Sequence, residues 1–386
     1  MKEKGIRRYT TGIIILAFSM ALATGIIGIL LNHIVDYYQL NSVQSGLISS
    51  IFSIGSAASI VLALILKSRV KKPVLIICLT AVLAAAFTLS GIPVPFVVFL
   101  VFCFFVGIGY GATDAFMDAS LADMHKEKTG KYLGIRHGCF GIVGIVAPIV
   151  IGAALGYVSW HTVYLVLGLI AGVSALFYFL VHRKYTGAVE ESRFIEKPFA
   201  IDDLKSFGHS GFIFLALSMF FTVAGQNGII VWVVRYVSTY QKHPEIASYC
   251  LSLFWLASTI IRFIMPYIPI SSEKKICIGA LGGGIFWALG VLIGTVPAML
   301  ICCFMTGLFV GSLFPLNIGL GTAMFSAKTG MITAILSFTK YIAQIIVPII
   351  IGALMSVLPA KVAILTAAVM YFCNAAAALG LLKAKK

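Results

Sequence analysis

Long apolar segments separated by short polar ones run through the whole chain. Each apolar segment is long enough to cross a hydrocarbon core of about 30 Å as a helix. Lipid offers no hydrogen-bond partner to exposed backbone groups, so such segments must be helical. The pattern predicts twelve spans, near residues 11–34, 43–66, 73–90, 94–122, 132–156, 161–181, 210–236, 246–269, 275–294, 297–323, 331–356 and 361–382.

The composition agrees with this pattern and excludes a soluble domain. The chain has 386 residues, of which 60% are hydrophobic and 11% are charged, and its mean hydropathy is +1.05. A soluble protein of this length carries about a quarter charged residues. The first apolar segment follows a basic stretch, as in a signal peptide, but no small-residue cleavage site follows it. We therefore expect this segment to be retained as the first span.

The net charge of +15 is distributed unevenly along the predicted topology. If the N-terminus is cytoplasmic, 23 of the 28 lysines and arginines fall on the cytoplasmic side. Only Arg235, Lys242 and Lys361 fall on the other side, and Arg262 and Lys340 lie inside spans. This asymmetry is the positive-inside pattern, and it predicts a multi-pass protein of the cell membrane with both termini in the cytoplasm. The anionic partner that it indicates is the lipid bilayer, not nucleic acid.

The two halves of the chain repeat each other at an offset of 200 residues. The repeat predicts an all-α integral membrane protein with two pseudo-symmetric six-helix bundles, 1–181 and 210–386, joined by a cytoplasmic linker at 182–209. Parallel repeats of this kind place a substrate site between the bundles, near the middle of the membrane. The matching positions are Cys103-Phe104 with Cys303-Phe304, Gly107 with Gly307, Gly111 with Gly311, Lys128-Thr129-Gly130 with Lys328-Thr329-Gly330, and Pro148-Ile149 with Pro348-Ile349.

Five short motifs stand out within the predicted spans. They are QSGLI at 44–48, GIGYGATD at 107–114, HGCFG at 137–141 with Ala147-Pro148, LFWL at 253–256 with Arg262, and Phe314-Pro315. Through these motifs the chain resembles the major facilitator superfamily, and within it the fucose/glucose/galactose permease-like sugar–proton symporters. The resemblance implies a monomeric transporter that works by alternating access, with a central cavity lined mainly by spans 1, 4, 7 and 10.

Three positions depart from the pattern of these symporters. Lys67 replaces the acidic residue of the signature loop between spans two and three. Gly28 stands where span one normally carries an acid, and Gln226 stands where span seven often carries glutamate. The usual arrangement for proton coupling is therefore changed in this chain.

Two carboxylates lie within the predicted spans. Asp114 and Asp118 are four residues apart, so they share one face of the fourth span. A charge in the bilayer interior is costly, and such residues therefore face a cavity or a partner. We predict that Asp114 and Asp118 couple transport to protons, with His137 as a further carrier because imidazole titrates in the right range. Alternatively, Asp118 has a structural role and pairs with Arg136 or His137.

The cations inside spans, Arg262 and Lys340, equal the aspartates in number. They either form ion pairs that rearrange during transport or bind an anionic substrate. Polar and aromatic residues of the second half are typical of sugar sites, because amides bond neighbouring hydroxyls and an indole ring stacks on a pyranose. The predicted substrate-binding set is Gln226, Asn227, Trp232, Trp255, Arg262, Asn317, Lys340 and Gln344.

The expected function is secondary active transport of a small polar solute, with a sugar or sugar derivative favoured and proton coupling expected. Symport or exchange of a small organic anion is the alternative, followed by proton-driven drug efflux. The chain contains no GxxxxGK[ST] phosphate loop and no HExxH pattern, so we expect neither ATP-driven pumping nor an enzyme. We expect no cofactor and no metal, with the proton as the coupling ion.

Overall fold

The computed structural model of the chain is all-helical in the residues that it describes, which are 2–66, 70–125, 129–185, 210–325 and 329–384. Twelve helices or helix pairs within these ranges are long and apolar enough to cross a membrane. The predicted all-α fold with twelve spans is therefore confirmed. The predicted linker lies almost entirely outside the described residues.

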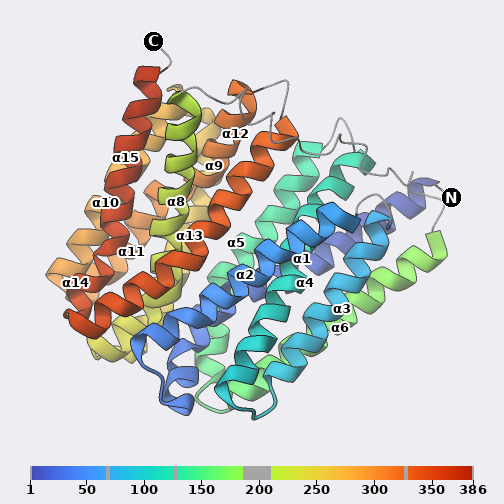
Figure 1. Cartoon of the computed structure of the whole chain (residues 1–386), viewed down its shortest axis with the longest axis horizontal. Helices are drawn as coiled ribbons and strands as arrows, with labels where there is room; N and C mark the ends of the chain where they lie inside the picture. The colour runs from blue at the N-terminus through green and yellow to red at the C-terminus, as the bar shows by residue number, and fades with distance from the viewer. Residues whose placement is uncertain (1, 67–69, 126–128, 186–209, 326–328, 385–386) are drawn as a thin grey trace. The chain divides into compact units, whose positions relative to one another are not determined.

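Two compact units divide the chain. Unit 1 comprises residues 1–34 and 48–196, and unit 2 comprises 35–47 and 197–386. The first six helices are α1 (Lys2–Tyr38), α2 (Ser42–Leu66), α3 (Lys72–Ser90), α4 (Phe96–His125), α5 (Thr129–Ala154) and α6 (Trp160–Tyr185), drawn from blue to green in Figure 1.

Among the later helices, drawn from green to red, four spans consist of two successive helices, which none of the earlier spans does. The later helices are α8 (Ser210–Arg235) with the π-helix η2 (Tyr236–Tyr240), α9 (Pro244–Ile264) with the 3-10 helix η3 (Met265–Tyr267), α10 (Ser272–Ile293), α11 (Val296–Val310), α12 (Leu313–Met324), α13 (Thr329–Val357), α14 (Ala360–Ile364) and α15 (Thr366–Ala384). The tenth and twelfth spans are therefore each made of two helices, α11 with α12 and α14 with α15.

The packing of each unit depends on the same close contact between two helices. In unit 1, a Cβ atom on Gly107 of α4 would overlap the carbonyl oxygen of Phe52 on α2. In unit 2, a Cβ atom on Gly307 of α11 would overlap the carbonyl oxygen of Phe254 on α9. Glycine is required at these positions because the two backbones approach too closely for any side chain. The internal repeat of the sequence is thus also a repeat of helix packing.

A second glycine one turn further on extends each contact. Gly111 packs on the backbone of Ser56 in unit 1, and Gly311 packs on the backbone of Ser258 in unit 2. The Oγ of Ser258 donates a hydrogen bond of 3.2 Å to the Gly307 carbonyl oxygen. Two successive contacts fix both the distance and the rotation of each helix pair. The pairs α2 with α4 and α9 with α11 therefore hold the polar side chains on these helices in fixed positions.

Candidate functional site

A cluster of charged side chains around the buried Arg136 joins α4 to α5 in unit 1. Asp114 and Asp118 share one face of α4, as their spacing predicts, and the guanidinium of Arg136 on α5 contacts both. Arg136 Nη2 donates to Asp114 Oδ1, and Arg136 Nη1 donates to Asp118 Oδ1 at 2.6 Å. The Arg136 side chain is 0% exposed, whereas the aspartates are 21% and 33% exposed. One buried cation is therefore shared by two carboxylates that remain partly open to solvent.

His137 and Phe140 complete the surroundings of this cluster. The Nε2 atom of His137 lies 3.4 Å from Asp118 Oδ2, and His137 is 51% exposed. The Arg136 guanidinium lies over the Phe140 ring, 5.4 Å from its centroid. Among the described residues, Arg136 Nε has no hydrogen-bond partner although it is buried. An exposed imidazole therefore lies beside the cluster, and the Nε–H group of Arg136 takes part in no hydrogen bond that the structure describes.

Arg136 has a larger role in the structure than the sequence pattern predicts. The positive-inside count assigns it to the cytoplasmic loop, and it enters only as a partner for Asp118. The structure instead buries it in α5, bonded to Asp114 as well. The signal available in the sequence was its place four residues inside the span that begins at Tyr132.

Two predicted substrate ligands of unit 2 instead bond backbone carbonyls that prolines leave free. Pro315 has no N–H group, so it cannot donate to the Gly311 carbonyl four residues earlier. Arg262 Nε donates to this carbonyl at 2.9 Å. In α13, Pro348 leaves the Gln344 carbonyl free in the same way.

The second of these bonds comes from α8. Asn227 Nδ2 donates to the Gln344 carbonyl oxygen at 3.5 Å, which is long for a hydrogen bond. Both Arg262 and Asn227 therefore support a helix at a proline in this structure. Their predicted contact with substrate stays a prediction.

Trp232 and Asn317 lie inside the packing of unit 2, where they are 0% exposed. Asn317 Nδ2 donates to Thr222 Oγ1 at 3.2 Å, and Thr222 Oγ1 also accepts from Asn374 Nδ2 at 2.7 Å. Ser218 donates to Asn374 and closes a polar network that links α8, α12 and α15. In this arrangement neither Trp232 nor Asn317 is open to a solute.

The other predicted ligands, Gln226, Trp255, Lys340 and Gln344, are only partly buried. Lys340 Nζ lies 4.5 Å from the centroid of the Tyr341 ring and 5.8 Å from that of Phe314 on α12. No ion pair of Lys340 occurs within the parts of the chain that the structure describes. The Lys340 ammonium is thus held by aromatic rings and not by a carboxylate among these residues.

Comparison with known proteins places this arrangement in a family. The family model described as Major Facilitator Superfamily matches residues 13–276. No curated protein sequence matches the chain.

Solved transporters share the fold at low sequence identity. A bacterial homologue of the human lysosomal transporter Spinster, inward-facing and occupied, is 14% identical with a TM-score of 0.73, covering 97% of this chain and 94% of that chain. A peptide transporter, POT, in complex with sulfate is 12% identical with a TM-score of 0.77, again covering 97% and 94%. Because the family model covers well over half of the residues, the chain belongs to the major facilitator superfamily of membrane transporters.

Proposed function

We propose that the protein is a proton-coupled secondary transporter of a small polar solute, and that the cluster of Asp114, Asp118 and Arg136 is its proton site. The observation that carries this proposal is the shared guanidinium. Two ionised carboxylates and one guanidinium leave one net negative charge inside a membrane span. Uptake of one proton makes the cluster neutral while Arg136 keeps a charged partner.

The proton matters for transport because of the cost of charge in a membrane. An uncompensated charge in the bilayer interior costs at least a few kcal/mol. The neutral cluster is therefore cheaper to enclose away from water than the charged one. A transporter built on this difference changes conformation readily only after it has bound a proton.

His137 supports a route for the proton. It is half-exposed and touches Asp118, the more exposed of the two aspartates. Imidazole exchanges protons near neutral pH, so it is suited to pass them between solvent and a carboxylate.

A sugar or sugar derivative remains the favoured substrate. Gln226, Gln344 and Trp255 are the uncharged members of the predicted set that are only partly buried and whose side chains form no hydrogen bond that the structure describes. They offer amides for hydroxyl groups and an indole surface for a sugar ring. A small organic anion is the second candidate, because Lys340 lies on aromatic rings and has no carboxylate partner in the described part of the chain.

The test begins with the thermal unfolding of the purified protein in the presence of sugars, sugar acids and short carboxylates. A bound solute raises the unfolding temperature because it stabilises the folded state. For a sugar, Gln226→Ala and Trp255→Ala should weaken the binding of the stabilising solute more than Lys340→Ala does. If only carboxylates stabilise the protein and Lys340→Ala alone abolishes their effect, the anion is the substrate class.

A further inference from the structure

A cavity of about 410 Å³ opens at one end of unit 2, where η2, the last turn of α10 and the first turn of α14 meet. This end lies opposite the C-terminus, as the position of α14 in Figure 1 shows. Its polar lining consists of Tyr236, Tyr240, Gln241 and Lys361. This volume lies within the range of small-molecule sites.

The backbone is adapted to this cavity. The η2 segment is a π-helix, in which Gln241 N–H bonds the Tyr236 carbonyl oxygen at 3.0 Å. The wider turn brings Tyr236, Tyr240 and Gln241 to the cavity together, and π-helical turns are frequent at functional sites. Across the cavity, α10 ends at Gly294, whose φ of 71° lies in the left-handed region.

Donors and an acceptor face the cavity. Lys361 Nζ donates to the Leu292 carbonyl oxygen at 2.7 Å, and an ammonium group has two further N–H groups to offer. Gln241 Oε1 is buried, and among the described residues it has no hydrogen-bond donor. A ligand that satisfies both groups carries an anionic oxygen for Lys361 and a hydrogen-bond donor for Gln241.

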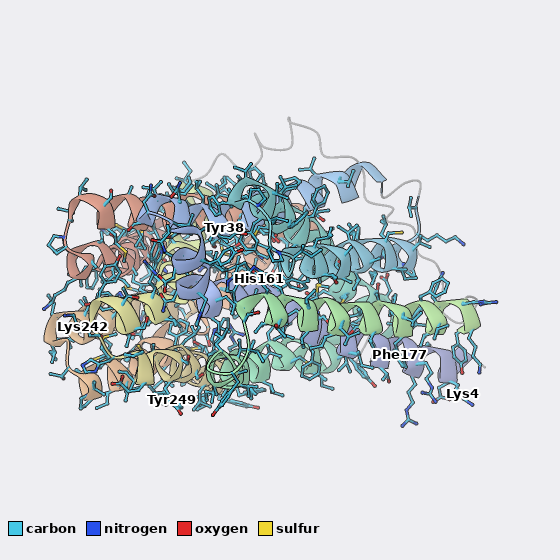
Figure 2. The ribbon with its side chains drawn as sticks, turned by 90° about the horizontal axis from the view of Figure 1, so that it is seen from below. Lys4, Tyr38, His161, Phe177, Lys242 and Tyr249 are labelled. Carbon is cyan, nitrogen blue, oxygen red and sulfur yellow. The ribbon has the colours of Figure 1, made fainter. Side chains whose placement is uncertain are left out.

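Charge concentrates at the same place. The three cations that the positive-inside pattern leaves on this side are Arg235, Lys242 and Lys361. Arg235 directly precedes η2, Lys242 follows Gln241, and Lys361 lines the cavity. Figure 2 labels Lys242 at this end of the unit, and its side chain is exposed. Within the described residues neither Lys242 nor Lys361 forms an ion pair, so the charge of both can attract an anion to this cavity.

The mouth of the cavity is continuous with the apolar surface of α10. Ile293 lines the cavity and is 57% exposed. Leu281, Ile285, Leu289 and Leu292 are also exposed, and their spacing places them along one face of α10 that leads to the mouth. An amphiphile fits this surface, with its head group in the cavity and its chain along α10.

We propose that this cavity binds the head group of a membrane phospholipid, namely a phosphate with a hydroxyl or ammonium donor beside it. The phosphate lies at Lys361 and the tyrosines, and the neighbouring donor bonds Gln241 Oε1. The lipid chain then covers the exposed face of α10. A free organic phosphate shares this head-group chemistry but leaves the apolar face uncovered.

Lipid titrations of the purified full-length protein in neutral detergent test this proposal through the unfolding temperature and the number of lipids bound in native mass spectra. Phosphatidylglycerol and phosphatidylethanolamine should stabilise the protein, because each carries a donor next to the phosphate. Phosphatidylcholine lacks that donor and should stabilise it much less. Equal stabilisation by all three lipids would overturn the proposal, as would a soluble glycerol phosphate that stabilises the protein as well as the lipid does.

Two variants and one matched control locate the site. Lys361→Gln should weaken phosphatidylglycerol binding roughly fivefold, the effect of one basic residue at a membrane surface. Gln241→Leu should weaken phosphatidylglycerol binding without any change in charge, and this variant provides the test if Lys361→Gln does not fold. Lys275→Gln is the control, because Lys275 Nζ likewise donates to a helix-end carbonyl, Met265 O at 3.0 Å. Unchanged binding in both site variants, or equal weakening in the control, would refute the assignment.

Discussion

Replacing Asp114 by asparagine tests the proton site directly. The substitution keeps the shape of the side chain and removes one of the two negative charges around Arg136. The remaining aspartate and Arg136 then form a permanently neutral pair, which imitates the protonated cluster. We expect this variant to exchange its solute down a concentration gradient but to lose accumulation driven by protons.

The size of the effect follows from the charges in the cluster. Two ionised carboxylates and one guanidinium become neutral on taking up a single proton, so the proposed mechanism predicts one proton for each transport cycle. One pH unit is worth about 1.4 kcal/mol per proton, or a tenfold concentration ratio. With the membrane potential clamped, a gradient of two pH units should drive roughly hundredfold accumulation in the wild type and none in the variant. Asp118→Asn should act similarly, because Arg136 is shared, whereas the sequence alone assigns Asp118 the smaller role.

Uptake of labelled solute into proteoliposomes, with and without the imposed pH gradient, measures this effect. The matched control is Asp123→Asn on the same helix, because Asp123 pairs with Lys72 at 2.6 Å outside the cluster. This control should accumulate solute as the wild type does. An Asp114→Asn variant that still accumulates solute, or a wild type indifferent to the gradient, would refute the reasoning and favour uniport or exchange.

Three further predictions concern stability and topology. Arg136→Gln leaves two carboxylates without their buried cation and should lower the free energy of unfolding by about 3–5 kcal/mol. Replacing either aspartate by asparagine in this variant should restore part of the loss, and denaturant titration in mixed micelles measures the single and the double variants. If the losses from the Arg136 and aspartate substitutions simply add, Arg136 is not shared by the two carboxylates. Arg262→Ala should lower the free energy of unfolding by about 1–3 kcal/mol in the same titration. Adding Pro315→Ala to this variant should restore part of the loss, because alanine at 315 supplies an N–H group for the Gly311 carbonyl. A double variant as unstable as Arg262→Ala alone would disprove this structural role. Cysteine-accessibility labelling should place 182–209 in the cytoplasm and 237–245 outside, and the reverse pattern would overturn the predicted orientation.

The helical spans were predictable because the bilayer imposes one requirement on every segment that crosses it. A long apolar run must be helical, so hydropathy alone gives twelve spans, as the structure has them. The break between α11 and α12 is less evident from hydropathy, because Gly311 and Pro315 lie inside one continuous apolar run. The spacing of Asp114 and Asp118 also sufficed to place them on one helix face.

Partners on other helices could not be read from the sequence. Arg136 joins the aspartates through the packing of α5 on α4, and no local pattern reports this contact. Trp232 is the converse case. Its indole ring and its place near a span end are typical of a membrane anchor or a sugar platform, whereas tertiary packing buries it completely. Side-chain chemistry indicates what a residue can bind, but accessibility depends on the whole fold.

The glycine contact that recurs in both units has a consequence for the history of the chain. After a duplication, both copies have kept the positions where two backbones touch, Gly107 and Gly307. The positions beside them have specialised separately. At the offset of the repeat, Asp114 corresponds to Phe314, and Phe140 corresponds to Lys340.

In the first copy the cation Arg136 lies over Phe140, and in the second the cation Lys340 lies over Phe314, the counterpart of Asp114. The two copies have thus exchanged the positions of charge and ring on a common framework. When the glycine contacts that hold the helices together are kept in both copies, the other positions of each copy are free to acquire a different task. Under the proposed function, the first half would respond to protons while the second half adapts to the solute.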